Sequence, residues 1–332
     1  MIRPNVLVLA SDVLFPHFFS AESQNKLTEV TDWKRSSATE DSPALREQIA
    51  DADVLMTTWH TPFLTAEMLG MRPRVKLIAH CGGEVKSRIA EQIFDYITIT
   101  NAAEPMARGV AEMALALALT LVRRIPEYAS EMREGVVRTN AEVSRGETLF
   151  GRKVGLVGFG RIGRAFARLI APFQVHLIVT DPYADPDMIA EYSGRLAELD
   201  DLVRSCSVIV LAAALTPETR NLFDKRRLSE MADESYLINV ARGGLVDTEA
   251  LLVELRTGRL RAALDVTDPV EPLPIDHELR KLTNVILTPH IAAGGIEMRR
   301  EIGAIAVEEV VRFAEGRAPI NRVSREMLAT MT

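Results

Sequence analysis

Residues 154–163 read VGLVGFGRIG, an apolar run followed by three glycines in the spacing G-x-G-x-x-G. A helical pattern follows at once, so the stretch predicts a strand, a tight turn and a helix. Gly158 permits the turn, Gly160 lacks the Cβ that would keep a pyrophosphate from the backbone, and Gly163 lets the helix pack close to the sheet. Because the N-terminus of a helix favours an anion, the pattern predicts a dinucleotide site. For the motif alone, a glycine-rich turn without a ligand is the alternative.

A second expected strand, 175–180, ends in Asp181, which lies 18 positions past Gly163. An acid about 20 residues after the last glycine is typical of the residue that binds the ribose hydroxyls of adenosine. A carboxylate there repels a 2′-phosphate, and the following Pro182 and Tyr183 carry no positive charge to attract one. The sequence therefore predicts NAD; an NADP-linked reductase is the alternative.

The composition is that of an ordinary globular protein. The 332 residues are 47% hydrophobic and 26% charged, enough for about two domains of ~150 residues. The net charge is −7 and no block of Lys and Arg occurs, so we expect no nucleic acid and no membrane as a partner. Cys81 and Cys206 have neither metal-ligand spacing nor a disulfide framework, which suits a reducing cytoplasm and predicts no metal site.

Two further features favour a cytoplasmic location. The first residues lead directly into an expected strand, 6–10, without the charged and apolar regions of a signal peptide. The longest apolar segment, 109–122, contains Glu112 and is expected to be too short to span a bilayer.

Strand patterns alternate with helical patterns along the whole chain, which predicts an α/β fold with parallel sheets covered by helices. In the first hundred residues we expect strands at 6–10, 53–57, 75–79 and 97–100, with helices near 45–49 and 89–93. From residue 151 the pattern restarts, with expected strands at 154–157, 175–180, 208–212, 236–240, 262–266 and 285–288.

Two long helices are expected outside this alternation. Residues 110–124 are rich in Ala and Leu on nearly every side, so this helix should be buried at a domain or subunit interface. Residues 301–315 carry apolar side chains at helical spacing and can return to pack on the first domain. The first domain would then be discontinuous.

Three motifs that follow expected strands carry side chains suited to chemistry, at the edge where open α/β sheets place their ligands. In the first, Arg242 offers a fork of donors that matches a 2-hydroxy or 2-keto carboxylate, with a structural salt bridge as the alternative. The second contains Asp265, Asp268 and Glu271, of which we expect Asp268 to be a solvated loop acid.

The third motif, LTPHIAAGG at 287–295, places His290 just past a strand, where Pro289 restricts the turn. Four other histidines have no such setting and are expected to be structural or exposed: His17, His60, His176 and His277. His80 is harder to dismiss, because the run HCGG at 80–83 also ends an expected strand.

With these motifs, the chain resembles the D-isomer-specific 2-hydroxyacid dehydrogenases. The resemblance runs nearly end to end and is carried by the fingerprint with Asp181, LTPETR at 215–220, NVARGGLVD at 239–247 and TPHIA at 288–292. It implies two Rossmann-like, doubly wound parallel-sheet domains. The substrate domain, 1–104 plus 297–332, would be flavodoxin-like and discontinuous, and residues 105–296 would form the NAD-binding domain. The family also buries the helix at 110–124 between subunits, which implies a homodimer.

By the same resemblance, the catalytic residues are Arg242, Glu271 and His290. Gly82 and Gly83 fall in a loop whose backbone amides meet the substrate carboxylate, together with Arg242 and His290. Cofactor contacts are expected from Gly158, Gly160, Arg161, Ile162, Gly163, Asp181, Ala213, Val240, Ala241, Asp265, His290 and Gly294.

Some positions depart from the family pattern. One extra residue precedes Glu271, which leaves open whether the carboxylate of Glu271 points toward His290. Ala214 replaces a proline, and Met106 stands at a commonly polar position. Arg108 either favours a second anionic group or is an ordinary surface residue. These departures concern substrate identity more than the type of reaction.

The implied reaction is hydride transfer between NAD(H) and a small D-2-hydroxy acid or 2-keto acid, with glyoxylate or hydroxypyruvate as the first expectation. Arg242 would bind the carboxylate, His290 would give a proton to the C2 oxygen during reduction, and Glu271 would fix the imidazole tautomer. Because a fold alone does not establish catalysis, an NAD(H)-sensing, corepressor-like binding protein on the same fold is the alternative.

Overall fold

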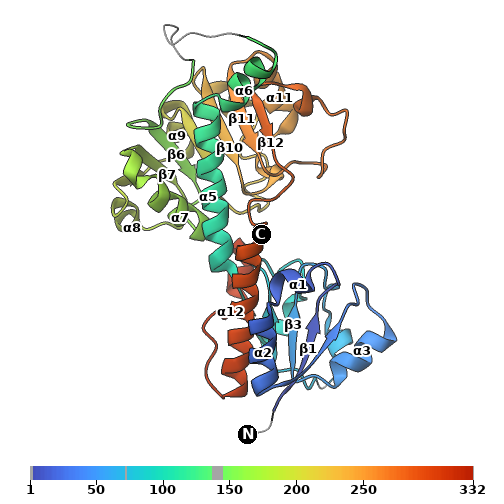
Figure 1. The fold of residues 1–332 in the computed structure, drawn as a ribbon. Coiled ribbons are helices and arrows are strands. Elements are labelled where there is room, and N and C mark those ends of the chain that lie inside the picture. The colour runs from blue at the N-terminus through green and yellow to red at the C-terminus, as the bar shows by residue number, and fades with distance from the viewer. Residues whose placement is uncertain (1–2, 72, 137–144, 332) are drawn as a thin grey trace. The chain divides into compact units, whose positions relative to one another are not determined.

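The computed structural model describes residues 3–71, 73–136 and 145–331, which form two compact units (Figure 1). Unit 1 comprises Met1–Met106 and Gly294–Thr332, and unit 2 comprises Ala107–Ala293. Each unit is an α/β fold built on one parallel sheet, as the alternation of patterns predicts. Unit 1 is discontinuous in sequence.

Unit 1 contains a five-stranded sheet in the order β2-β1-β3-β4-β5. The strands are β1 (Asn5–Leu9), β2 (Asp32–Ser36), β3 (Val54–Thr57), β4 (Leu77–His80) and β5 (Thr98–Asn101). This is the flavodoxin-like order, and its direction reverses between β1 and β3. The edge strand β2 is absent from the expected strands because its sequence, DWKRS, is polar and largely exposed.

The helices of unit 1 include α1 (Phe15–Phe18), α2 (Ala21–Val30), α3 (Pro43–Ala50), α4 (Ala66–Leu69) and α12 (Ile296–Ala314). The helix expected near 89–93 is a short 3-10 turn, η1 (Glu91–Asp95). Helix α12 returns from the end of the chain and packs beside α1 and α2 (Figure 1). It begins at Ile296, before the expected residue 301. The sequence pattern missed this first turn because it is largely exposed and carries no apolar periodicity.

Unit 2 contains a seven-stranded sheet in the order β12-β11-β10-β9-β6-β7-β8. The strands are β6 (Lys153–Val157), β7 (His176–Thr180), β8 (Gly194–Leu196), β9 (Val208–Leu211), β10 (Ser235–Asn239), β11 (Leu260–Leu264) and β12 (Val285–Leu287). Six of them, read from β8 to β11, have the Rossmann order, and the direction reverses between β6 and β9. Strand β8 was not expected, because three residues carry no recognisable period.

The helices of unit 2 are α6 (Ile125–Arg133), α7 (Arg161–Ile170), α8 (Pro186–Ala190), α9 (Leu199–Ser205), α10 (Lys225–Glu230) and α11 (Thr248–Arg256), with short 3-10 turns η2 (Ala171–Phe173), η3 (Gly243–Leu245) and η4 (Glu278–Lys281). Helices cover both faces of the sheet. On β9, Val208 and Val210 belong to one core, and Ile209 and Leu211 belong to the other. The strand therefore reads as a continuous apolar run.

Helix α5 (Ala103–Val122) begins seven residues before the expected position and crosses the division between the units. Pro105 lies in its first turn, where the missing N–H costs nothing. The helix ends before Arg124, whose φ of 51° is left-handed. At 20 residues, α5 is long and apolar enough to cross a membrane by length and composition, contrary to our expectation, but half of its most apolar window is buried in the structure. A buried core helix has the same properties.

Gly303 allows α12 to lie against α1. A Cβ at this position would lie 1.8 Å from the carbonyl oxygen of Phe18. Helix propensity alone predicts that Gly303→Ala stabilises the protein by about 1 kcal/mol. We expect the opposite, a fall of about 1–3 kcal/mol in the free energy of unfolding, because the backbone of α1 must move.

Urea unfolding followed by circular dichroism would measure this change. Ala304→Gly, at the exposed neighbouring position, calibrates the helix-propensity contribution by itself. A rise in stability of Gly303→Ala would contradict the packing described here.

Candidate active site

The three glycines of the fingerprint have different surroundings in the structure. Gly158 has a φ of 97°, and a Cβ there would lie 2.6 Å from the backbone nitrogen of Ala213. A Cβ on Gly163 would lie 2.2 Å from the carbonyl oxygen of Gly158, so α7 approaches the end of β6 closely. A Cβ on Gly160 would meet nothing within 4 Å. The backbone there is open to a ligand, as a pyrophosphate requires.

Asp181 follows β7 and lies beside this glycine turn. One carboxylate oxygen accepts the backbone N–H of Phe159 at 2.7 Å, and the other accepts that of Tyr183 at 2.8 Å. The acid expected to bind ribose is therefore held by the same loop that would bind the phosphates. This arrangement fits NAD, because the cofactor's two parts would meet adjoining groups of one loop.

The other expected cofactor residues occupy ends of strands or starts of helices. Arg161 and Ile162 open α7, Ala213 follows β9, and Val240 and Ala241 follow β10. Gly294 is the first residue of the second segment of unit 1. The contacts of these residues with the cofactor stay predictions.

His290 and Glu271 meet directly. His290 Nδ1 lies 2.7 Å from Glu271 Oε1, with the two side chains 49% and 35% exposed. The extra residue before Glu271 therefore does not turn the carboxylate away. With Nδ1 bound to Glu271, Nε2 is the ring nitrogen available to a substrate.

The backbone of His290 has a φ of 54°, which is uncommon for a residue other than glycine. Asp265 supports this conformation. Its carbonyl accepts the His290 N–H at 2.9 Å, and its carboxylate accepts the hydroxyl of Thr288 at 2.5 Å and the N–H groups of Ile291 and Ala292 at 3.0 and 2.9 Å.

These contacts add a second role for Asp265. Its resemblance-based assignment is to the cofactor, but the residue is 1% exposed and both carboxylate oxygens already accept hydrogen bonds. The structure gives Asp265 the task of positioning the turn that carries His290, which no sequence spacing indicated. A contact with the cofactor stays a prediction.

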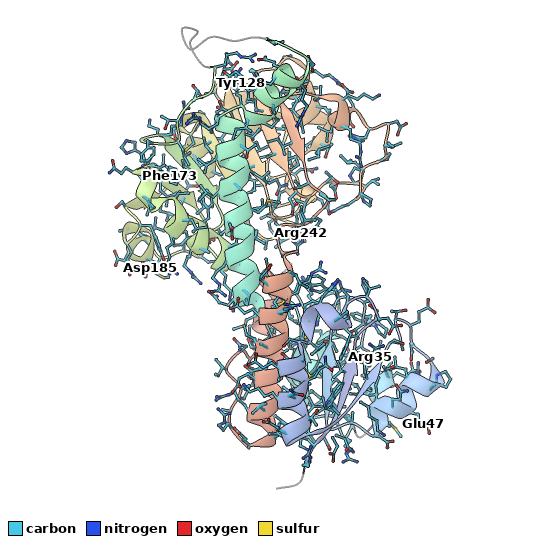
Figure 2. All side chains as sticks on the ribbon, in the orientation of Figure 1. Arg35, Glu47, Tyr128, Phe173, Asp185 and Arg242 are labelled. Carbon is cyan, nitrogen blue, oxygen red and sulfur yellow. The ribbon has the colours of Figure 1, made fainter. Side chains whose placement is uncertain are left out.

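Arg242 follows β10 and is labelled in Figure 2. Its Nη1 donates to the carbonyl of Ala241 at 2.7 Å. The buried side chain of Asn239 clamps the same loop, because it accepts the Ala241 N–H at 3.1 Å and donates to the Arg242 carbonyl at 2.9 Å. Sequence reasoning overlooked this role of Asn239, although the residue closes an apolar strand where a polar side chain needs a partner.

The loops that carry Arg242 and Glu271 are in backbone contact. A Cβ on Gly243 would lie 2.2 Å from the carbonyl carbon of Thr267. Asp268, in the second loop, lies 3.6 Å from Arg220, and its carbonyl accepts the hydroxyl of Thr248. The structure thus brings the loops of Arg242 and of the Glu271–His290 pair together at one edge of the unit 2 sheet, and gives Asp268 a structural role.

Gly82 and Gly83 lie in unit 1, after β4. Their carbonyls accept hydrogen bonds from the backbone of Ala102 at 2.8 Å and from the side chain of Asn101 at 2.6 Å. Within the described residues, no hydrogen-bond acceptor faces the Gly83 N–H. That amide is therefore free to meet a carboxylate.

His80 is fully buried at the end of β4, with Nδ1 2.8 Å from the hydroxyl of Thr57. Burial, and to a smaller extent the charge of Arg88, lowers the pKa of His80 to about 3. The imidazole is therefore neutral at neutral pH and cannot be the imidazolium that gives a proton to a substrate. Its burial and lowered pKa make His80 a poorer candidate for the proton donor than His290.

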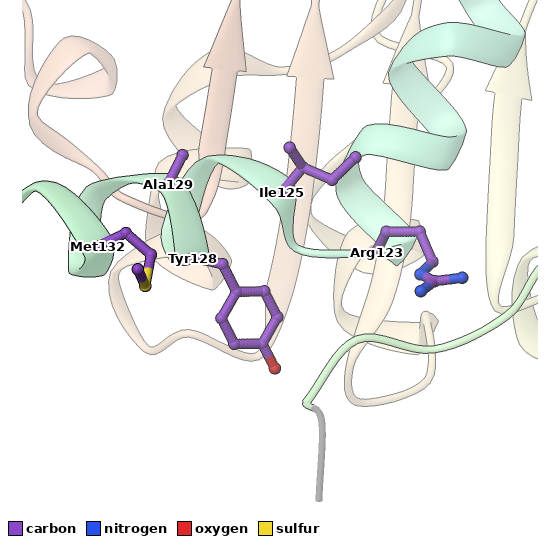
Figure 3. Close-up of a pocket in the computed structure, with 5 residues that line it drawn as sticks. All are labelled: Arg123, Ile125, Tyr128, Ala129 and Met132. Carbon is purple, nitrogen blue, oxygen red and sulfur yellow. The ribbon is translucent and has the colours of Figure 1, made fainter. Parts of the chain in front are cut away.

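Other features lie apart from these residues. A surface hollow at α6 is lined by Arg123, Ile125, Tyr128, Ala129 and Met132, none of them an expected site residue (Figure 3). Burial raises the pKa of the Cys81 and Cys206 thiols. Across the described parts of the chain, His, Cys, Asp and Glu side chains nowhere gather in a group of three that could hold a metal.

Residues 115–292 match the family described as D-isomer specific 2-hydroxyacid dehydrogenase, NAD binding domain. The chain belongs to this family. It is 33% identical over 292 residues to a glyoxylate reductase of Thermococcus onnurineus, with 86% of each chain covered. It is 32% identical over 284 residues to a D-3-phosphoglycerate dehydrogenase of Methanocaldococcus jannaschii, of which it covers 53%.

Solved structures agree with the fold. The TT0316 protein of Thermus thermophilus matches with a TM-score of 0.78 and 32% identity, over 96% of this chain and 99% of that one. A D-lactate dehydrogenase with NAD+ from Lactobacillus jensenii has the same fold, with a TM-score of 0.79 at 24% identity over 96% and 99%. The protein is therefore an NAD-dependent oxidoreductase that acts on CH–OH groups, and the corepressor-like alternative receives no support.

Asp181 generates a prediction about cofactor choice. NADH should bind more tightly than NADPH, because the carboxylate would face a 2′-phosphate. Asp181→Ala should weaken the binding of NADH by about 10–100-fold, because a charged hydrogen bond worth about 1.5–3 kcal/mol is lost. It should also narrow the difference in affinity between NADH and NADPH. Fluorescence titration with both cofactors measures this.

Asp187→Ala removes the same charge from an exposed position in α8 and controls for net charge. Equal affinities of the parent protein for NADH and NADPH would be incompatible with the role given to Asp181.

Proposed function

We propose that this protein catalyses reversible hydride transfer between NAD(H) and a small D-2-hydroxy acid or the corresponding 2-keto acid, with glyoxylate and hydroxypyruvate as the first substrates to test. The observation that carries the proposal is the 2.7 Å contact between His290 Nδ1 and Glu271, which leaves Nε2 for the substrate. The glyoxylate reductases among the relatives support the choice of first substrates.

The bound NAD would supply the hydride or accept it, held by the glycine turn and Asp181. His290 gives a proton to the C2 oxygen during reduction and takes it back during oxidation. Glu271 holds the ring in one tautomer. Arg242 offers two parallel donors to the substrate carboxylate and polarises the C2 oxygen. In unit 1, the Gly83 amide is the donor available to a carboxylate, because the Gly82 N–H already donates to the carbonyl of His80 at 3.0 Å.

Replacing the proton donor tests this assignment. His290→Ala should lower kcat for glyoxylate reduction by about 10²–10⁴-fold and leave NADH affinity nearly intact, because only proton transfer is lost. Glu271→Gln should lower kcat less, since an amide can still hold the ring but carries no charge. Steady-state kinetics and NADH titration measure both effects.

Arg220→Ala is the control, because Arg220 pairs with Asp268 in the loop that carries Glu271. This variant changes the loop without removing a reacting group. Full turnover by His290→Ala would place the proton donor elsewhere.

We also propose a cytoplasmic homodimer with no nucleic-acid or membrane partner. Ile125 and Met132 of α6 are 53% and 67% exposed beside the apolar hollow of Figure 3, and α5 has further half-exposed apolar side chains. Contiguous exposed apolar surface is typical of a subunit interface. The net charge of −7 supports the absence of polyanionic partners.

Sedimentation at micromolar concentration should therefore give a dimer. The double variant Ile125→Glu with Met132→Glu should shift it toward the monomer, because two charges would have to be buried. Met327→Glu, at an exposed methionine of unit 1, should leave the dimer intact. A parent protein that sediments as a monomer would refute the dimer.

A further inference from the structure

The reversal of strand order between β1 and β3 in unit 1 marks a second place where an α/β sheet is suited to a ligand. Ser11 follows β1, and Trp59 and His60 follow β3. Ser11 Oγ lies 3.0 Å from His60 Nδ1. The Gly82–Gly83 loop, which follows the neighbouring β4, lies at the same edge.

Trp59 and His80 converge on Gly82. A Cβ on Gly82 would lie 2.5 Å from His80 Nε2 and 2.9 Å from Trp59 Nε1. His80 Nε2 is buried and has no hydrogen-bond partner. The loop proposed to bind the carboxylate is therefore lined on one side by two ring nitrogens, and any side chain at position 82 would displace them.

The other face of this group is formed by Arg299 of α12. Its guanidinium stacks over the Trp59 ring, 5.1 Å from the centroid. Its Nη1 lies 3.0 Å from His17 Nδ1, which must accept, since arginine only donates. Its Nε is buried and has no partner. The side chain is thus fixed in place by an aromatic face and a neutral imidazole.

Arg299 also has no carboxylate within ion-pair distance among the described residues. Arg35, Arg74 and Arg325 of unit 1, by contrast, each pair with an acid. A positioned guanidinium with a buried donor left unpaired is costly unless a ligand supplies the acceptor. Trp59 connects this free cation to the Gly82–Gly83 loop.

We propose that Arg299 and Trp59 form a subsite for a second negatively charged group of the substrate, so that the preferred 2-keto acid carries a carboxylate or phosphate at the end opposite its reacting carbonyl. The inference rests on the proposed function, in which the Gly83 amide meets the first carboxylate. Arg299 pairs with the distal anion through its planar fork, and the Trp59 N–H donates beside it.

Paired substrates that differ in the distal group test this subsite. Reduction is measured for oxaloacetate against 2-oxobutyrate, 2-oxoglutarate against 2-oxovalerate, and 3-phosphohydroxypyruvate against hydroxypyruvate. We expect kcat/KM of the parent to favour the charged member of at least one pair by about tenfold or more, the worth of one charged hydrogen bond. The pair with the largest ratio identifies carboxylate or phosphate as the distal group.

Arg299→Met keeps the apolar stem of the side chain but has no guanidinium to bind an anion. It should reduce the ratio of charged to uncharged substrate to about one, mainly by raising KM for the charged member. Arg300→Met removes the same charge at the exposed neighbouring position and should keep the parent's ratio. Arg299→Lys retains charge without the fork and should give an intermediate ratio.

The two proposals fail in different ways. If the parent reduces no 2-keto acid of the panel, the proposed function is wrong. If the parent reduces them but shows no preference for charged members, or if Arg299→Met keeps that preference, the reaction stands and the Arg299 subsite is refuted.

Discussion

The carboxylate of Asp265 is almost fully buried at the end of β11, where it accepts three hydrogen bonds from the turn that carries His290. Burying a charge is costly unless donors surround it, and each such bond contributes about 1.5–3 kcal/mol. The bonds therefore fix a left-handed residue that would otherwise be strained. With the backbone of His290 held, its ring meets Glu271, and the geometry of the reacting group depends on a residue that need not touch the substrate.

Close backbone contacts set the positions of the remaining loops. Gly158 lies against the end of β9, Gly163 against Gly158, and Gly243 against Thr267. In each case a methyl group would force the two backbone segments apart. The parallel sheet brings these loops to one edge, and the glycines let them approach to backbone contact. In unit 2, the groups expected to bind the cofactor and those expected to bind the substrate therefore lie on neighbouring loops.

Unit 1 combines the same architecture with a different chemistry. Its loops contribute the backbone amide of Gly83 and, beside the same loop, the Trp59–Arg299 pair, held by an aromatic contact and by His17. Helix α12 supplies Arg299 from the far end of the chain, and Gly303 in the same helix allows it to pack on α1. The fold of a discontinuous unit thus brings a cation to the loop that no local sequence pattern predicts.

The sequence by itself determined the fold class, the family, the cofactor and the candidates for the catalytic pair, Glu271 and His290. It could do so because apolar runs, glycine spacing and strand-end motifs are local properties of the chain. It failed at β2 and β8, which are polar or short, and at the starts of α5 and α12, whose first turns have no apolar period. Only the tertiary structure decided that Glu271 meets His290 despite an extra residue, that Asp265 and Asn239 position their loops, that His80 is buried and neutral, and that Arg299 stacks on Trp59. Each of these depends on contacts between segments far apart in the chain, and the free energy of such contacts is set by burial and distance, which residue order does not contain.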